Sequence, residues 1–556
     1  MKLSGRSNRK VCLRGIYVAV GAALLLSVFT IPAQAQSLPT RHVRQAVITG
    51  EARYLGSLPA TQTLNLTIAL PLRNEAELDN LLEDLYNPGS SLFHQFLSVE
   101  EFTARFGPTE ADYAAVVHFA EQNGLTVTGT YANRLVVNVT GSVENIEKAF
   151  QVTMGSYQHP TESRAFYSPD REPAPALNVA LWHVGGLDNF SIPHPASLVK
   201  TPEARSGTTG SGPSGYFLGS DMRKAYYGGT ALTGAGQSVG LVEFLGYNIA
   251  DVNTYFSKYG PTNSVSVVGV STDGSSLSCT YPACDDTEQA LDIEEAISMA
   301  PGLTSVRVYV SDTSDVSIFN KMASDNISKT LSCSWGWSPA DPSSDDPIFK
   351  EFATQGQNLF AASGDSGSYS RRSQDVYPAD DAYLTSVGGT DLTTNGAGGS
   401  WKSETAWRDS GGGPSPDGIA IPSYQTTSGV ITTANNGSKT LRNSPDVAAE
   451  ANTDNYICYD GTCAGGWGGT SFAAPRWAAF VALVNQQYVS LNVNSGKTLG
   501  FLNPLIYTIG LGSSYSTAFH DITSGSNGAY SAVKGYDLVT GWGTPNGTGL
   551  INALAP

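Results

Sequence analysis

Histidine is scarce in this chain, and it is unevenly distributed. Only seven of the 556 residues are histidine, and six of them precede a Ser/Gly/Thr-rich stretch at residues 206–215. That stretch has the composition of a linker. The part of the chain beyond it contains a single histidine, His520. Chemistry that needs an imidazole base would therefore depend, in this second part, on His520 alone.

Long apolar runs and zinc-type cysteine pairs are also lacking. After the first 35 residues no apolar run is long enough to cross a bilayer, and the six cysteines include no C-x₂-C pair. Lys and Arg number 32 against 49 Asp and Glu, so the net charge is −17. We expect no membrane anchor, and the acidic balance disfavours nucleic acid as a partner.

The first residues have the pattern of a secretory leader. Basic residues within 2–14 precede an apolar run at 16–31 and then Ala-Gln-Ala at 33–35. A charged region, an apolar region and a small-residue cleavage site are typical of a signal peptide. We predict that residues 1–35 are removed and that the protein is secreted to the extracellular space.

Two domain-sized stretches flank the linker. Residues 36–195 combine a strand-like run at 63–72 with helical spacing at 75–86, which predicts a compact α+β domain. In residues 213–556 strand-like runs alternate with helical ones, a pattern that favours an α/β domain with a mostly parallel sheet covered by helices. We predict that the connection, residues 196–212, is exposed and open to cleavage.

The elements expected in the second domain are bounded by their apolar patterns. We predict strands at 237–244, 265–270, 305–310 and 358–363, and helices at 288–299, 315–325 and 471–488.

One segment joins a glycine turn to a long apolar helix. Gly468-Gly-Thr-Ser-Phe-Ala-Ala-Pro475 precedes the apolar run 476–484 and so presents Ser471 at the N-terminus of a buried helix. Unpaired N–H groups and the helix dipole favour negative charge there. A serine nucleophile needs a base, and serine triads of the subtilisin and chymotrypsin types place their histidine before the serine. The second domain does not offer that order.

Glu288 and Asp292 offer another kind of base. They are four residues apart in a predicted helix and therefore share one helical face. In a buried cleft two such carboxyls would share a proton and titrate as a pair, so one of them could accept a proton from Ser471 in acid. Taken alone, the pair is more typical of an acidic first turn that complements the helix dipole.

A further carboxyl, Asp365, follows the apolar run at 358–363 in Gly364-Asp-Ser-Gly367. The pattern indicates a buried strand that ends in a tight functional turn. Gly-Asp-Ser-Gly also surrounds the nucleophile of chymotrypsin-like enzymes, which would make Ser366 the nucleophile. That interpretation needs a histidine upstream in the same domain, and none precedes His520 there, so we reject it.

Taken in order, Glu288-x-x-x-Asp292, Ser-Gly-Asp365-Ser-Gly and Gly-Gly-Thr-Ser471-x-x-x-Pro475 resemble the serine-carboxyl peptidases of the sedolisin or kumamolisin family. Residues 97–107 resemble the activation prodomain of that family. The resemblance covers nearly the whole chain after the leader. It implies a subtilisin-like peptidase domain at 213–556 and a zymogen whose prodomain, at 36–195, assists folding and blocks the active-site cleft.

The resemblance also implies a role for each matched residue. Ser471 would be the nucleophile, Glu288 its general base and Asp292 the group that orients Glu288. Asp365 would be the oxyanion donor, a role open to a carboxyl only while it is protonated. An apolar site can keep an aspartate neutral in this way.

Two more positions match the family's hydrogen-bond network around the carboxyl pair. Glu243, in Val239-Gly-Leu-Val-Glu243, would be a second acid behind the pair, and Trp335 would extend the network. Glu243 is almost as well interpreted as an acid at the end of a buried strand.

These roles imply a pH range for hydrolysis of protein and peptide substrates. Glu288 must be ionised enough to act as a base while Asp365 keeps its proton. Because carboxyl groups ordinarily titrate near pH 4, we expect activity at roughly pH 3–5.

A metal site is expected near the C-terminus. The resemblance implies one Ca²⁺ held by the side chains of Asp521 and Asp537 and by the carbonyls of Ile522, Val533 and Gly535, an oxygen set that suits this ion. Val533 replaces a glycine of kumamolisin-like members, which a carbonyl ligand tolerates. Without the resemblance, the two aspartates are more typical of turns.

The cysteines of the second domain form two local pairs. Cys279 with Cys284 and Cys458 with Cys463 are expected to form small disulfide loops that flank Glu288 and Ser471, and Cys333 is expected to be a buried free thiol. Disulfides suit a secreted protein.

The resulting hypothesis is a secreted, monomeric zymogen of an acid-acting serine-carboxyl endopeptidase that removes its own prodomain. An endopeptidase is favoured over a tripeptidyl-peptidase, although loops that the sequence does not define decide between them. Two rivals stay open: a peptidase that uses His520 as its base, and an inactive secreted binding protein on the same scaffold.

Overall fold

The computed structural model describes residues 38–196, 199–200, 209–369, 375–491 and 497–556. The predicted signal peptide and most of the predicted linker lie outside the described residues. Among the described residues, no helix is long and apolar enough to span a membrane.

The second domain is built on an eight-stranded sheet with the order β11-β12-β10-β13-β15-β16-β17, in which β20 also pairs with β16. Every pairing is parallel except that of β16 with β17. The strands are β10 (Ser238–Glu243), β11 (Ser266–Ser271), β12 (Ser305–Val310), β13 (Thr330–Cys333), β15 (Asn358–Ala362), β16 (Thr385–Thr394), β17 (Trp401–Ala406) and β20 (Val447–Glu450). The predicted α/β fold with a mostly parallel sheet is confirmed.

Helices cover both faces of this sheet. The flanking helices are α6 (Gly219–Tyr226), α7 (Ile249–Lys258), α8 (Thr287–Met299), α9 (Asp315–Asp325), α10 (Asp346–Thr354), α12 (Thr470–Leu491), α13 (Asn503–Leu511) and α15 (Gly547–Leu554). Successive strand residues point to opposite faces: Leu241 belongs to the apolar cluster around α8 and α12, while Val242 belongs to the cluster around α9 and α10. Burial on both faces explains the nearly continuous apolar strands.

The N-terminal domain is a smaller α+β unit. Its four-stranded sheet has the order β3-β4-β2-β7, and a separate three-stranded sheet has the order β1-β5-β6. The strands of these sheets are β1 (Tyr54–Ser57), β2 (Thr63–Ala69), β3 (Thr126–Thr130), β4 (Val136–Ser142), β5 (Met154–Gln158), β6 (Ala165–Pro169) and β7 (His183–Gly185). The helices are α1 (Gln45–Ile48), α2 (Glu75–Leu85), α3 (Val99–Arg105), α4 (Glu110–Gln122) and α5 (Val143–Phe150).

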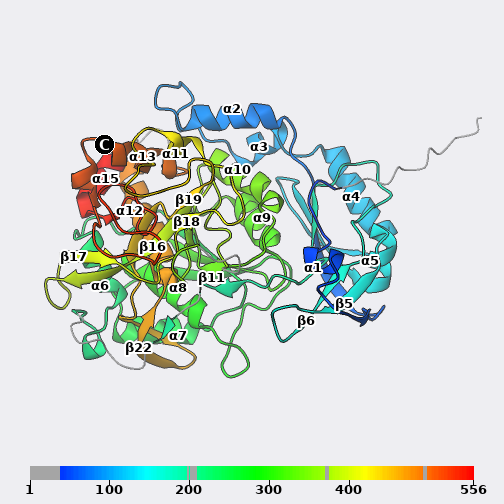
Figure 1. Cartoon of the computed structure of the whole chain (residues 1–556), viewed down its shortest axis with the longest axis horizontal. Helices are drawn as coiled ribbons and strands as arrows, with labels where there is room; N and C mark the ends of the chain where they lie inside the picture. The colour runs from blue at the N-terminus through cyan, green and yellow to red at the C-terminus, as the bar shows by residue number, and fades with distance from the viewer. Residues whose placement is uncertain (1–37, 197–198, 201–208, 370–374, 492–496) are drawn as a thin grey trace, which may run out of the picture.

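The two domains lie against each other over a large contact. In Figure 1 the N-terminal domain stands beside the parallel sheet, and α2 and α3 reach over the second domain next to α10. One apolar cluster contains Leu78 and Leu82 of α2 together with Phe319 of α9 and Phe349 of α10. Beside it, the buried Asn133 donates a hydrogen bond to the carboxyl of Glu351 at 2.9 Å.

Candidate active site

Ser471 lies at the beginning of α12, as the glycine turn predicted. The helix starts at Thr470 and its first four turns are buried throughout, with Ser471 fully inaccessible. The Ser471 hydroxyl donates to the carbonyl oxygen of Ser334 at 3.4 Å, and the Ser334 hydroxyl lies 3.3 Å from the Ser471 carbonyl oxygen. Ser334 follows β13 directly, so the sheet and α12 hold the candidate nucleophile between them.

Glu288 and Asp292 lie on α8, the helix packed beside α12. Both are buried. The Asp292 carboxyl accepts a hydrogen bond from the Ser334 hydroxyl at 2.8 Å. Both carboxyl oxygens of Glu288 lack a hydrogen-bond partner among the residues that the structure describes. Glu288 and Asp292 therefore lie beside Ser334 and Ser471, and the oxygens of Glu288 are available to accept a hydroxyl proton.

Glu243, the last residue of β10, continues this group of acids. Its Oε2 accepts a hydrogen bond from the indole N–H of Trp335 at 2.9 Å. It is fully buried, and its charge raises the pKa of Asp292. The structure thus brings Glu243, together with Trp335, next to Asp292.

Burial is the main cause of the pKa shifts in this group. The pKa of Glu288 is raised well above its usual range by burial and then by the charge of Asp292, while the Ser471 hydroxyl lowers it. The pKa of Asp292 is raised by burial and then by Glu243, and the pKa of Glu243 by burial and then by Glu288. Three adjacent carboxyls cannot all ionise, so they hold shared protons.

This result differs from the simple picture in which Glu288 titrates near pH 4. Sequence reasoning used the ordinary pKa of a carboxyl, because the depth of burial follows from packing between α8, α12 and β10. In the closed precursor the group retains protons to higher pH than an exposed pair would.

Asp365 follows β15, in the turn that the sequence indicated. Its Oδ1 accepts two hydrogen bonds from Thr470, one from the backbone N–H and one from the hydroxyl, each 2.7 Å long. Its Oδ2 is buried and, within the described part of the chain, has no partner. Burial raises the pKa of Asp365 well above its usual range. A proton on Oδ2 would make this side chain the hydrogen-bond donor that the resemblance implies.

A cleft of about 750 Å³ opens onto Glu288, and residues 192–195 form part of its lining together with Leu245, Trp335 and Trp467. Within this segment, β8 (His194–Pro195) pairs antiparallel with β14 (Trp335–Gly336). Farther along, β9 (Val199–Lys200) pairs antiparallel with β22 (Thr462–Gly468), the strand that leads into Ser471. The end of the N-terminal domain therefore runs along the cleft on both sides of Ser471.

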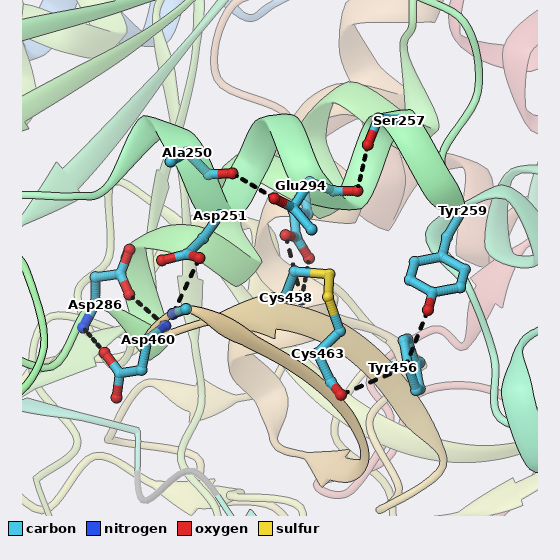
Figure 2. The surroundings of a disulfide bond; sticks show 12 residues. Ala250, Asp251, Ser257, Tyr259, Asp286, Glu294, Tyr456, Cys458, Asp460 and Cys463 are labelled. Carbon is cyan, nitrogen blue, oxygen red and sulfur yellow. Dashed lines mark hydrogen bonds between the residues drawn. A yellow bond between two sulfur atoms is a disulfide. The ribbon is translucent and has the colours of Figure 1, made fainter.

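Both predicted disulfides are present, and Cys333 is a buried free thiol. Cys458 and Cys463 join β21 (Asn455–Tyr459) to β22 (Figure 2). The buried Glu294 of α8 accepts hydrogen bonds from the Cys458 backbone N–H at 3.3 Å, which ties this hairpin to the helix that carries Glu288. Asp286 occupies the N-cap position of α8, but its side chain does not cap the helix. It accepts instead from the N–H groups of Asn248 and Asp460.

His520 lies in a different place from Ser471. It stacks on Trp401 with ring centroids 3.8 Å apart, and burial lowers its pKa to about 4. Among the described residues it makes no hydrogen bond to Ser471, Glu288 or Asp292. Nothing in this arrangement supports His520 as a base.

The predicted calcium ligands gather around one loop. Asp521 accepts from the Gly535 N–H at 3.1 Å, and Asp537 accepts from the Val533 N–H at 3.0 Å. In the described part of the chain no hydrogen bond reaches the carbonyl oxygens of Ile522, Val533 or Gly535, and no group of three His, Cys, Asp or Glu side chains forms a metal centre. Two carboxylates and three unpaired carbonyls form a donor set that suits a hard cation.

Two residues of the site carry roles that sequence reasoning missed. Thr470 holds Asp365, and Ser334 links the nucleophile to Asp292. Thr470 belongs to the sequence motif Gly-Gly-Thr-Ser and Ser334 to the motif Ser-Trp-Gly. These motifs were the signal from which the two roles could have been inferred. Their contacts join segments more than 100 residues apart in the first case and 42 apart in the second.

The sheet, the buried serine and the carboxyls define a peptidase with a subtilisin-like domain, and comparisons with known proteins agree. Residues 51–190 match the model of the pro-kumamolisin activation domain, and residues 302–506 match the subtilase family. Kumamolisin of Bacillus sp. (strain MN-32) is 31% identical over 537 residues, covering 90% of this chain and 93% of that protein. Sedolisin of Pseudomonas sp. (strain 101) is 29% identical, covering 98% and 97%.

A solved structure supports the same assignment. The structure of Pseudomonas sedolisin, a serine-carboxyl proteinase in complex with pseudo-iodotyrostatin, superposes with a TM-score of 0.52 at 27% identity, covering 62% of this chain and 98% of that one. The chain belongs to the sedolisin family. It is a serine-carboxyl peptidase, a hydrolase with an N-terminal activation prodomain.

Proposed function

We propose that the chain is the secreted zymogen of an endopeptidase that hydrolyses proteins at acidic pH and removes its own prodomain. Ser471 is the nucleophile, Glu288 accepts its proton, and Asp292, supported by Glu243 and Trp335, positions Glu288. The observation that carries the proposal is the meeting of Ser471, Ser334 and the buried pair on α8, with both Glu288 oxygens unpaired among the described residues.

Asp365 completes the reaction as the oxyanion donor. Thr470 occupies its Oδ1 with two hydrogen bonds, which leaves Oδ2 as the place for the proton. When Ser471 attacks a carbonyl carbon, negative charge develops on the carbonyl oxygen, and a protonated Asp365 donates to it. Losing one such donor typically raises the barrier by about 3–4 kcal/mol.

The buried carboxyls set both limits of the proposed pH range, and burial in the precursor moves both limits to higher pH than exposed carboxyls would give. Activity requires one negative charge in the Glu288 group and a proton on Asp365 at the same time. Because burial raises the pKa of Asp365, the proton is kept throughout acidic conditions and is lost as the pH rises through the folded-state pKa. At the low end, protonation of the whole Glu288 group removes the base.

Endopeptidase action is supported by the way the precursor fills its own cleft. The segment that pairs with β14 continues towards the N-terminus along the same cleft through Pro193 and Ile192. A cleft that accepts chain on both sides of Ser471 suits cleavage within a polypeptide. The same occupancy supports the prodomain as an intramolecular inhibitor.

One Ca²⁺ bound by Asp521, Asp537 and the carbonyls of Ile522, Val533 and Gly535 belongs to the proposal. When bound, the ion would neutralise two carboxylates and fix the loop at 533–537, far along the chain from the catalytic serine. Its role is structural, and the peptidase chemistry uses the side chains named above. Secretion, with residues 1–35 as the signal peptide, is supported by the two disulfides.

The test uses the purified precursor and its Ser471→Ala variant at pH 4. We expect the wild-type chain to shorten by about 160 residues and then to hydrolyse acid-denatured protein, and we expect the variant to do neither. Processing of Ser471→Ala at the wild-type rate would exclude self-cleavage. Loss of activity in His520→Ala, with a normal fold by circular dichroism, would favour the histidine-dependent rival.

A further inference from the structure

The segment that crosses the cleft is bound like a strand of substrate, and its register can be determined. His194 lies opposite Gly336 and Pro195 opposite Trp335. The backbone N–H of the next residue, Ala196, donates to the carbonyl oxygen of Ser334 at 2.9 Å. This antiparallel ladder fixes which residue reaches Ser334.

Ser334 is also the residue that the nucleophile touches. Its carbonyl oxygen accepts from the Ser471 hydroxyl at 3.4 Å and from the Ala196 N–H at 2.9 Å. Two donors that share one acceptor atom must lie close together, so the backbone of Ala196 is beside the candidate nucleophile.

Ala196 also borders the candidate oxyanion donor. It lines a small cavity of about 20 Å³ together with Gly364, Asp365, Tyr369 and Asp375, and it is 4% exposed. Of the residues in this segment that the structure describes, Ala196 alone is in contact with both the Ser334 side of the site and the Asp365 side.

We propose that the precursor cuts itself on the carboxyl side of Ala196, at the bond to Ser197, and that the peptidase favours extended segments with a small residue before the cut bond. The proposal rests on the proposed function. Bonds on either side fit less well, because His194 and Pro195 pair with β14 before Ser471 is reached, and Val199 pairs with Gly468 beyond it.

The reaction can be written with every atom accounted for. The Ser471 oxygen attacks the Ala196 carbonyl carbon and its proton passes to Glu288. The bond from that carbon to the Ser197 nitrogen then breaks, and the nitrogen takes the proton from Glu288. Water hydrolyses the Ala196–Ser471 ester, which releases the Ala196 carboxyl group and restores the hydroxyl.

The small-residue preference follows from the cavity beside Ala196. The space left there holds about one or two water molecules, and overfilling a packed site is costly. We expect serine at this position to be accepted, whereas tryptophan would need the lining to move.

The experiment follows the precursor at pH 4 from its earliest time points by intact mass and N-terminal sequencing. We expect the first new N-terminus to be Ser197. Ala196→Pro removes the N–H that donates to Ser334, and we expect this cut to slow at least a hundredfold. The matched control Ala196→Ser keeps the N–H and the small size, and it should be cut within about threefold of the wild-type rate. Ala196→Trp should be at least tenfold slower.

A synthetic peptide spanning residues 190–202 guards against misfolding of the variants. The processed enzyme should cut it after the alanine and should spare the peptide with proline in that place. A first cut elsewhere in a precursor whose Ser471→Ala form stays intact would overturn this register and leave the proposed function standing. Equal processing of the wild-type and Ser471→Ala precursors would instead overturn the proposed function.

Discussion

The two domains bury different titratable side chains. Among the described residues, the three histidines that are almost inaccessible, His42, His94 and His159, belong to the prodomain, whereas every buried Asp or Glu belongs to the peptidase domain, in which His520 is half-buried. Acid acts on these groups with opposite sign. It neutralises buried carboxyls, which burial favours, and it charges His94, whose pKa burial lowers.

The direction of the effect follows from linkage. Buried carboxyls such as Glu294 and Glu450 have raised pKa values, and the pKa of Asp286 is about 6. Their contribution to stability is complete below the unfolded-state pKa near 4 and is lost as the pH rises through the folded value. The pKa of His94 is lowered to about 4, so its contribution is complete above about pH 6.5 and is lost as the pH falls.

His94 lies where this contrast matters most, at the domain contact. It is 2% exposed and its Nδ1 is 2.9 Å from the Tyr488 hydroxyl of α12. Its Nε2 is buried and, among the described residues, has no partner. The groups that face it are Tyr86, which directly follows α2, Tyr488 and Lys497, and the charge of Lys497 further lowers its pKa. A proton on His94 therefore places an unpaired charge between the domains.

The largest expected effect is on the turnover rate and comes from a substitution in the peptidase domain. Asp365→Ala removes the proposed oxyanion donor, and we expect the turnover rate at pH 4 to fall several hundredfold without loss of fold. Asp365→Asn keeps a donor that needs no acid, so it should retain more activity than the alanine variant and hold it to higher pH. Rate measurements from pH 3 to 8 check this, and an unchanged pH profile in Asp365→Asn would contradict the role given to Asp365.

The second prediction concerns release of the prodomain. His94→Gln keeps a hydrogen-bonding group but cannot be charged, so we expect the cut prodomain to leave at pH 4 about tenfold more slowly than in the wild type. Size-exclusion chromatography of the cut complex measures the release. His118→Gln is the matched control, because His118 is exposed on α4, and it should release normally. Equal release in all three proteins would show that His94 does not sense acid.

The third prediction compares the domains directly. The melting temperature of the isolated, Ser471→Ala-inactivated peptidase domain should fall from pH 4 to pH 8, because its buried carboxyls lose protons that burial retains. In the intact Ser471→Ala precursor, hydrogen exchange of the prodomain should show the reverse, with protection lost as the pH drops from 7 to 4. Parallel trends in the two domains would contradict the contrast.

The smallest effect is expected at the calcium site. Removing Ca²⁺ with a chelator at neutral pH should lower the melting temperature of the precursor by several degrees, and Asp521→Asn should abolish that shift. The rate of peptide hydrolysis at 25 °C should change little. A melting temperature indifferent to Ca²⁺ would remove the ion from the proposal.

Sequence reasoning reached the parts of the fold that local patterns encode. The helix at 315–325 was predicted with the bounds it has, and the order of the acidic and serine motifs located the site. Sequence reasoning missed β16, a ten-residue strand that contains two adjacent glycines, and β13, which is only four residues long. Those strands depend on neighbours distant in the chain. Likewise, the raised pKa of Glu288 and the contact of Thr470 with Asp365 arise from packing between elements, which no local pattern encodes.

The apolar cluster shared by α2, α9 and α10 has a consequence for the cleaved molecule. Severing one peptide bond in the connecting segment leaves that cluster intact, so a nicked molecule stays closed for as long as its surroundings are neutral. Cleavage of the connecting segment and release of the prodomain are then separate events, and release requires the contact between the domains to open.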